Sequence, residues 1–296
     1  MRRIIIILFV LNSCTNENEK QVNKIEKQIE PQAKIDNNSK AKIEMPLSSN
    51  TIEDTIRYDT LEFPLIELSN DAKKNNNYFP GKILTTGHFH NEEVWPNAEN
   101  ENWFGIFRNK NGYYISQTKI TVNREHDGIV DAENSEVETG WEIKTENKDT
   151  SILLVSGLNH IQNHRINEIK LKDKIIFPGD SIKIEYKGNL YNIYATGIKF
   201  QPYESSNDYA ICNYKLFLKA KINGVEKSQL LVSSPRNDDA LANILFIGDI
   251  DGDGLLDIII DTTNHYNVER PTLYLSNPGD NEVLLKIVGI HVTYGC

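Results

Sequence analysis

Aspartates recur at alternate positions in one nine-residue stretch, D-I-D-G-D-G-L-L-D, which begins at Asp249 and ends at Asp257. Alternate side chains of a tightly curled loop point inward, and Gly254 at position 6 permits the sharp turn. Carboxylates this close repel one another unless a cation lies among them. Oxygen ligands in a flexible loop favour calcium over magnesium. We therefore expect Ca²⁺ as the cofactor, with the side chains of Asp249, Asp251, Asp253 and Asp257 and the carbonyl of Leu255 as ligands.

The residues on either side of this loop indicate strands. An EF-hand would place a bidentate Glu at position 12, where this chain has Ile260. Residues 242–247 and 258–260 are short apolar runs rich in β-branched side chains, which is typical of strands. A calcium loop between two strands resembles the FG-GAP or VCBS-type repeats of integrin α chains and many bacterial surface proteins. The resemblance covers residues 241 to about 274 and implies calcium binding, but no particular role.

That family usually has several repeats in series, whereas this sequence has one good copy. A degenerate echo places Asn123, Glu125, Asp127, Gly128 and Asp131 at positions 1, 3, 5, 6 and 9 of a similar loop. The residues that follow, 132–138, are acidic where an apolar strand should stand. The echo is either a second ion site or an acidic turn, and a full propeller is not expected.

The rest of the chain after residue 79 is patterned as strands. Residues 182–187 and 190–194 alternate around a Gly188-Asn189 turn, and 214–222 and 225–232 flank an Asn223-Gly224 turn. Further short strands are expected at 113–122, 141–145 and 152–155, and no long segment has a helical period. The predicted fold class is all-β or nearly so: antiparallel hairpins forming a β-sandwich-like domain over 79–296, or two β-modules divided near residue 173.

The N-terminus carries a targeting signal. Arg2 and Arg3 precede an apolar run over 4–11, which as a helix would span only about 12 Å and is too short to cross a membrane. The run ends in L-N-S-C, which resembles the bacterial lipobox. The resemblance implies that residues 1–13 are a signal peptide and that Cys14 is acylated and anchors the chain to a membrane. Residues 14–78, beginning with a polar and charged stretch, would form a flexible tether.

Three cysteines are present, at positions 14, 212 and 296, and no C-x-x-C pair occurs. In an oxidising compartment Cys212 and Cys296 are expected to form a disulfide that pins the end of the chain, with two buried free thiols as the alternative. The chain-entropy model assigns such a long loop roughly 4–5 kcal/mol of stabilisation.

Other residues suggest weaker candidates. Trp95, Trp103, Phe104 and Phe107 gather near His88 and His90, as a sugar-stacking surface or as an ordinary buried core. His160 and His164 have the spacing of a zinc pair, but a surface turn is favoured because no third ligand lies nearby in the sequence. His265 could border the calcium site or simply end a strand.

The composition narrows the function. The net charge of −10 disfavours nucleic acid as a partner. Neither G-x-S-x-G nor H-E-x-x-H occurs, so whether the chain is an enzyme stays open, with a non-catalytic role favoured. We expect a lipid-anchored protein of the bacterial cell envelope, at the outer membrane or cell surface. Its calcium-stabilised β domain would bind or adhere to an envelope or extracellular protein or glycan; the alternative is a glycan-active or other hydrolase with a structural calcium.

Overall fold

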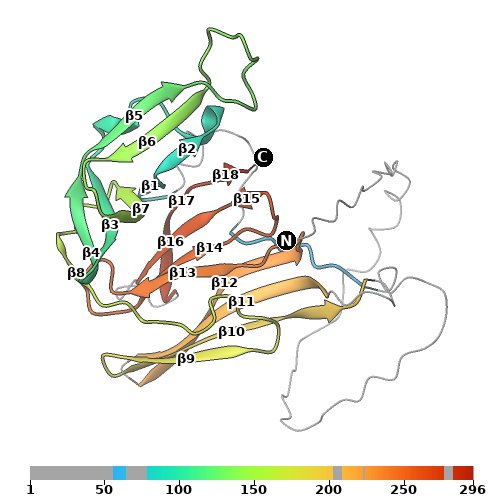
Figure 1. The fold of residues 1–296 in the computed structure, drawn as a ribbon. Coiled ribbons are helices and arrows are strands. Elements are labelled where there is room, and N and C mark those ends of the chain that lie inside the picture. Colours follow the sequence, from blue (N-terminus) through green and yellow to red (C-terminus); the bar gives the residue numbers. More distant parts are fainter. Residues whose placement is uncertain (1–55, 65–78, 203–208, 223, 277–282, 296) are drawn as a thin grey trace, which may run out of the picture. The chain divides into compact units, whose positions relative to one another are not determined.

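A computed structural model of the chain describes residues 56–64, 79–202, 209–222, 224–276 and 283–295 (Figure 1). Residues 50–296 form one compact unit, and its described part is built from antiparallel sheets with two short 3₁₀ helices. The predicted all-β fold class is therefore confirmed.

The central sheet carries the aspartate loop. Its strands are β13 (Asn243–Gly248), β14 (Asp257–Asp261), β16 (Pro271–Ser276) and β17 (Leu285–Ile290), hydrogen-bonded in that order. Side chains alternate across a strand, and in β14 Ile258 and Ile260 enter one hydrophobic core while Ile259 enters another. All three are fully buried. A strand covered on both faces needs an unbroken apolar run, which explains the triple isoleucine.

The first core lies between the central sheet and a sheet of long strands, β9 (Ser181–Tyr186), β10 (Asn189–Phe200), β11 (Ala210–Ile222) and β12 (Val225–Arg236), ordered β12-β11-β10-β9 (Figure 1). The β9–β10 turn is Lys187-Gly188, because Tyr186 pairs with Asn189. Both turn residues have positive φ, 45° and 80°, as a type I′ turn requires. The expected Gly188-Asn189 turn is thus wrong by one residue, and Lys187 takes the tip of the hairpin.

The second core lies on the other face of the central sheet. It is closed by β1 (Lys82–Leu84), β3 (Trp103–Asn109), β4 (Gly112–Thr118), β7 (Thr150–Ser156) and β8 (His164–Ile166), ordered β1-β7-β3-β4-β8. A third, Trp-rich core underlies β2 (Gly87–Phe89), β5 (Ile120–Glu125) and β6 (Gly140–Thr145), near the 3₁₀ helices η3 (Asn91–Glu93) and η4 (Ala98–Asn100). The short strands β15 (Val268–Glu269) and β18 (Thr293–Tyr294) pair with each other.

One strand boundary differs from the expected one. The strand expected at 113–122 is two strands, β4 and β5, which belong to different sheets. The division expected near residue 173 falls in the connection between β8 and β9. Because the central sheet contributes to the cores on both sides of it, the described strands share one layered arrangement.

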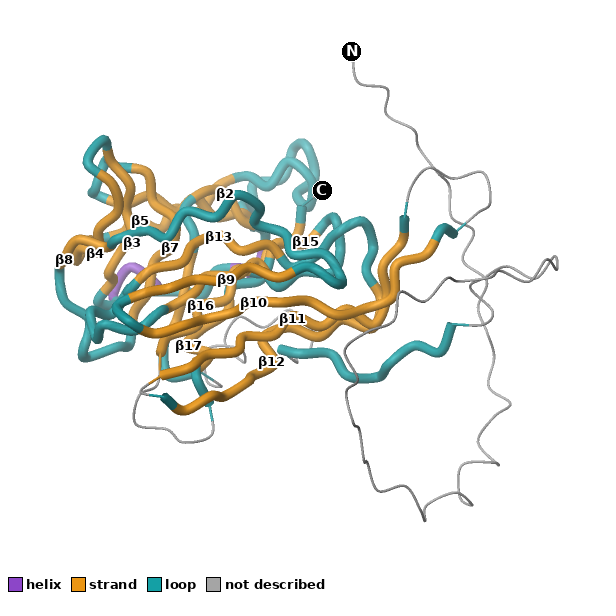
Figure 2. The backbone as a smooth tube through the Cα atoms, turned by 90° about the horizontal axis from the view of Figure 1, so that it is seen from below, coloured by secondary structure: helices purple, strands orange, loops and turns teal. Residues whose placement is uncertain are grey.

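The segment expected to be a tether is partly packed on the β unit. Residues 56–64, which we call the strap, run beside β12, blue in Figure 1 and teal in Figure 2. Phe63 and Ser233 exchange two backbone hydrogen bonds of 2.9 and 2.8 Å, and the Asp59 carboxylate pairs with Lys215. The signal peptide expected at 1–13 and most of the tether expected at 14–78 lie outside the described residues.

Candidate metal centre

The aspartate loop joins neighbouring strands of the central sheet. Asp249 follows the last residue of β13, and Asp257 is the first residue of β14, where it pairs with Gly248. Between them Gly252 and Gly254 have φ of 85° and 91°, a region that side chains disfavour. The loop therefore turns sharply at its two glycines, and its two end carboxylates start from fixed positions in a buried sheet.

Three of the four aspartates converge. Asp249, Asp251 and Asp257 each offer a carboxylate oxygen, and these oxygens lie within 4.8 Å of one another. The Asp253 carboxylate is outside this group and instead accepts hydrogen bonds from the Leu255 amide, at 2.7 Å, and from the Ser276 hydroxyl. The structure thus brings together three of the predicted ligands, while ligation by Asp253 and by the Leu255 carbonyl stays a prediction.

The electrostatics of the loop favour a cation. Burial, with the neighbouring Asp251 charge, raises the pKa of the Asp257 carboxyl well above its usual value, although the Ser276 and Ile250 amides donate hydrogen bonds to it. Burial, and next the Asp253 charge, also raise the pKa of Asp251. These shifts mean that the negative charges are held together at a cost which a bound cation would offset.

One oxygen of the trio has no partner. Asp249 is 8% exposed; its Oδ2 accepts from the Gly254 amide at 3.0 Å, but its Oδ1 is buried without a hydrogen-bond partner among the described residues. Buried carboxylate oxygens are seldom left unsatisfied. An orphaned oxygen beside two other carboxylates fits the oxygen ligand set of calcium, so the residues present fit the expected ion.

Three basic side chains from distant segments surround the loop. Lys187, at the tip of the β9–β10 hairpin, places Nζ 2.8 Å from Asp249 Oδ2. His160 Nε2 lies 3.5 Å from Asp251 Oδ2, and His164 Nε2 lies 3.3 Å from the Asp249 carbonyl oxygen. The sequence singled out the two histidines for their mutual spacing, but their common neighbour is the aspartate loop. Nothing in the local sequence of Lys187 marks it as a neighbour of this loop.

The echo over residues 123–131 is an internally bonded turn. Asp127 accepts hydrogen bonds from the Ile129 and Val130 amides and lies 2.5 Å from His90 Nδ1, while Asp131 accepts from Thr139. Both carboxylates are occupied, and their side chains are only 3% exposed, although residues 128–130 of the turn are exposed. The hydrogen bonds that Thr139 donates to the Asp131 carboxylate lower the pKa of Asp131 to about 2.

Glu125, from the same echo, belongs to a different group. Its Oε1 lies 2.6 Å from His88 Nδ1, and oxygens or nitrogens of His88, Glu125 and Glu142 lie within 4.8 Å of one another on the β2-β6-β5 sheet. Glu142 is also paired with Lys144, and the His88 side chain is 70% exposed. The existing pairs account for this cluster without an ion.

The remaining candidates have structural roles. Trp95, Trp103 and Phe107 are buried, and Trp95 and Trp103 belong to the third core, which favours the core interpretation over sugar stacking. His265 stacks on Tyr266 and lies 3.1 Å from Asp238, so its contacts are not with the aspartate loop.

Cys212 is a free thiol that is 2% exposed, and no disulfide is found among the described residues. The expected bridge to Cys296 is therefore not observed, and Cys296, like Cys14, lies outside the described residues. Burial raises the pKa of the Cys212 thiol, which makes it a poor nucleophile. Cys212 behaves here as a small apolar side chain of β11.

The chain matches no protein-family model, no curated protein and no solved structure. The likeness of the loop to FG-GAP or VCBS repeats and that of the N-terminus to a lipobox thus rest on their own residues. Within the described ranges no helix is long and apolar enough to cross a membrane.

Proposed function

We propose that this protein is a lipid-anchored component of the bacterial cell envelope whose β unit is stabilised by calcium and acts as a non-catalytic binding module. The observation that supports calcium best is the buried, unpartnered Asp249 Oδ1 beside the carboxylates of Asp251 and Asp257. The calcium would be structural, because the loop sets how β13 and β14 leave the turn and enter a sheet buried on both faces.

The residues in the loop define what the ion would contribute. Asp249, Asp251 and Asp257 would hold it, and the ion would offset the burial and the charge repulsion that raise the pKa values of Asp251 and Asp257. An ion that binds only the folded chain adds its binding free energy to stability, about 2.7 kcal/mol at a hundredfold excess over the dissociation constant. For a unit of this size that corresponds to a rise in midpoint of about 5–10 °C.

A thermal melt of the full-length chain in detergent, with millimolar calcium and with chelator, tests the proposal. We expect the calcium-dependent rise in midpoint to disappear in Asp251→Asn and to persist in Asp173→Asn, which alters an exposed carboxylate outside the loop. Magnesium should give a smaller rise than calcium. An unchanged midpoint of the unsubstituted chain in calcium would overturn the proposed site.

The proposed envelope location rests on the N-terminal signal. Because the strap packs on the β unit, the proposed tether is shortened to the residues that precede the strap. The binding role rests on the absence of G-x-S-x-G and H-E-x-x-H from the sequence, together with a fold in which the loop aspartates are engaged by backbone amides of the loop itself.

A further inference from the structure

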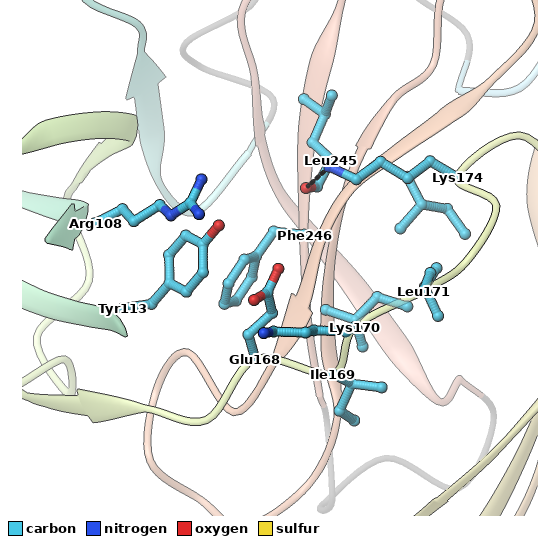
Figure 3. A pocket seen from close by; sticks show the side chains of 11 residues that line it. Arg108, Tyr113, Glu168, Ile169, Lys170, Leu171, Lys174, Leu245 and Phe246 are labelled. Atoms are coloured by element: carbon cyan, nitrogen blue, oxygen red, sulfur yellow. Dashed lines mark hydrogen bonds between the residues drawn. The ribbon is translucent and has the colours of Figure 1, made fainter. Parts of the chain in front are cut away.

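A pocket of about 290 Å³ opens where three chain segments meet, and the loop aspartates are not among the residues that line it (Figure 3). The β3–β4 hairpin contributes Arg108 and Tyr113, the connection after β8 contributes residues 168–171 and 174, and β13 contributes residues 244–247. The connection is fixed along β13 by the Ile169 amide on the Ile247 carbonyl and by the Ile244 amide on the Lys174 carbonyl, both at 2.9 Å. The walls are therefore held by backbone hydrogen bonds.

The apolar residues of this pocket lie behind its rim. Phe246 is 3% exposed, and its ring lies 5.0 Å from that of Tyr113, measured between centroids. Ile244 and Ile247 also line the pocket, but their side chains are buried in the first core. The half-buried Tyr113 ring is therefore the aromatic surface that a ligand can reach, in a pocket whose volume is at the lower end of small-molecule sites.

Positive charge gathers at the rim. Arg108, Lys170 and Lys174 line the pocket, and none of them forms a salt bridge with a carboxylate of the described ranges. The Arg108 guanidinium lies over the Tyr113 ring, 5.6 Å from its centroid, and Lys174 Nζ lies 3.3 Å from the Leu245 carbonyl oxygen. Both cations are thus positioned by neutral groups.

One acid lines the same pocket. Burial, and next the Glu168 charge, raise the pKa of the Tyr113 hydroxyl. Three cations and one carboxylate line the pocket, which leaves it positive on a protein whose net charge is −10.

We propose that this pocket binds a small organic anion, in which a carboxylate or phosphate group contacts Arg108 and Lys170 and a sugar-sized body lies against the Tyr113 ring. A guanidinium stacked on a ring keeps its N–H edge for an oxyanion, which it holds with two parallel hydrogen bonds. This inference rests on the proposed function as a binding module, and it adds the chemical class of the ligand. The pocket residues do not include the loop aspartates.

Titration calorimetry of the full-length chain in calcium tests this. The probes are glucuronate, neutral glucose and inorganic phosphate. We expect saturable binding of glucuronate, at least tenfold weaker binding of glucose, and phosphate binding that is weaker than that of glucuronate because phosphate has no ring to lie against Tyr113. Phosphate binding as tight as that of glucuronate would overturn the role of Tyr113.

Matched variants locate the binding. Arg108→Gln and Lys170→Gln should each weaken glucuronate binding about tenfold, whereas Lys110→Gln and Lys172→Gln, two residues away on the same segments and outside the pocket, should not. Equal losses in all four variants, or equal binding of glucose and glucuronate, would overturn the proposal. Anion binding without any effect of calcium on the melt would contradict the calcium proposal alone, and a calcium-dependent melt without anion binding would contradict the pocket alone.

Discussion

Lys187 places an ammonium group against one of the carboxylates that would hold the ion. Its Nζ lies 2.8 Å from Asp249 Oδ2, and this contact raises the pKa of Lys187. Without calcium the ammonium supplies part of the positive charge that the loop needs. With calcium the two cations compete for the same carboxylate and repel one another. Lys187 would therefore stabilise the calcium-free loop and weaken the proposed calcium binding.

Lys187→Gln should bind calcium several-fold more tightly and should be less stable in chelator. The loss in chelator should be at most about 1 kcal/mol, because the Lys187 side chain is half exposed and its charge is screened by solvent. A calcium titration and a melt in chelator measure the two effects. Lys183→Gln, an exposed lysine on the same hairpin, is the control, and weaker calcium binding by the Lys187 variant would contradict this role.

His291 makes the stability of the fold depend on pH. Burial lowers the pKa of His291 to about 4. Its Nε2 donates to the Glu93 carbonyl at 2.9 Å, and its Nδ1 lies 3.2 Å from the Thr85 hydroxyl, which can donate to it. Both contacts fit the neutral ring. Because the unfolded ring titrates near 6.5, the unfolded state binds more protons between pH 6.5 and 4.

Acidification through that window should therefore destabilise the fold through His291, by up to about 3 kcal/mol. In His291→Gln this part of the pH dependence should be absent, whereas His126→Gln, which changes a half-exposed histidine, should keep it. Urea unfolding at pH 7 and at pH 4 gives the difference between the variants. An identical loss of stability in wild type and His291→Gln would show that His291 is not the group responsible.

At the scale of elements, local patterns predicted local structure. The alternation in β9 and β10 and the apolar runs around the loop indicated the strands, because their side chains alternate or run unbroken according to which faces are buried. The loop geometry followed from its glycines and alternate aspartates. Sequence could not place Lys187, His160 and His164 beside the loop, since those contacts join segments 62 or more residues apart.

The strap was also missed, for a related physical reason. The strap, I-R-Y-D-T-L-E-F-P, is richer in apolar and aromatic side chains than the polar stretch before it. Its partners, however, lie in β11 and β12: the Asp59 amide donates to Asn213, and Arg236 lies over the Tyr58 ring. Those strands are 154 or more residues further along the chain, and a nine-residue segment does not indicate which distant strand it pairs with.

Hydrogen exchange tests the strap directly. The amides of Phe63 and Ser233, which bond to each other's carbonyl groups, should exchange slowly. The amides of Thr60 and Leu61, which bond only to the adjacent Asp59 carboxylate at an exposed position, should exchange fast and serve as the internal control. Equally fast exchange at all four amides would show that the strap detaches from β12.

At the scale of the whole molecule, the central sheet links the aspartate loop to most of the core. One face of β14 packs into the first core and the other into the second, so the order of the loop affects both layers. The proposed anion pocket depends on the same sheet, because residues 244–247 of β13 line it. β13 ends at Gly248, and the aspartate loop begins at the next residue, Asp249. A structural ion at one corner is therefore well placed to stabilise the binding unit as a whole.

The proposed location requires that the chain be anchored through Cys14, and acylation at that residue is the last prediction. The L-N-S-C motif after an eight-residue apolar run motivates it. Several acyl chains on one cysteine hold a protein firmly at a membrane, whereas one chain binds only marginally. Metabolic labelling of the producing cells with a fatty-acid analogue should tag the wild type and Cys212→Ala but not Cys14→Ala, since Cys212 is a buried thiol. Cys14→Ala should also leave the membrane fraction. Equal labelling of wild type and Cys14→Ala would remove the anchor from the proposed function while leaving the calcium loop and the anion pocket to their own tests.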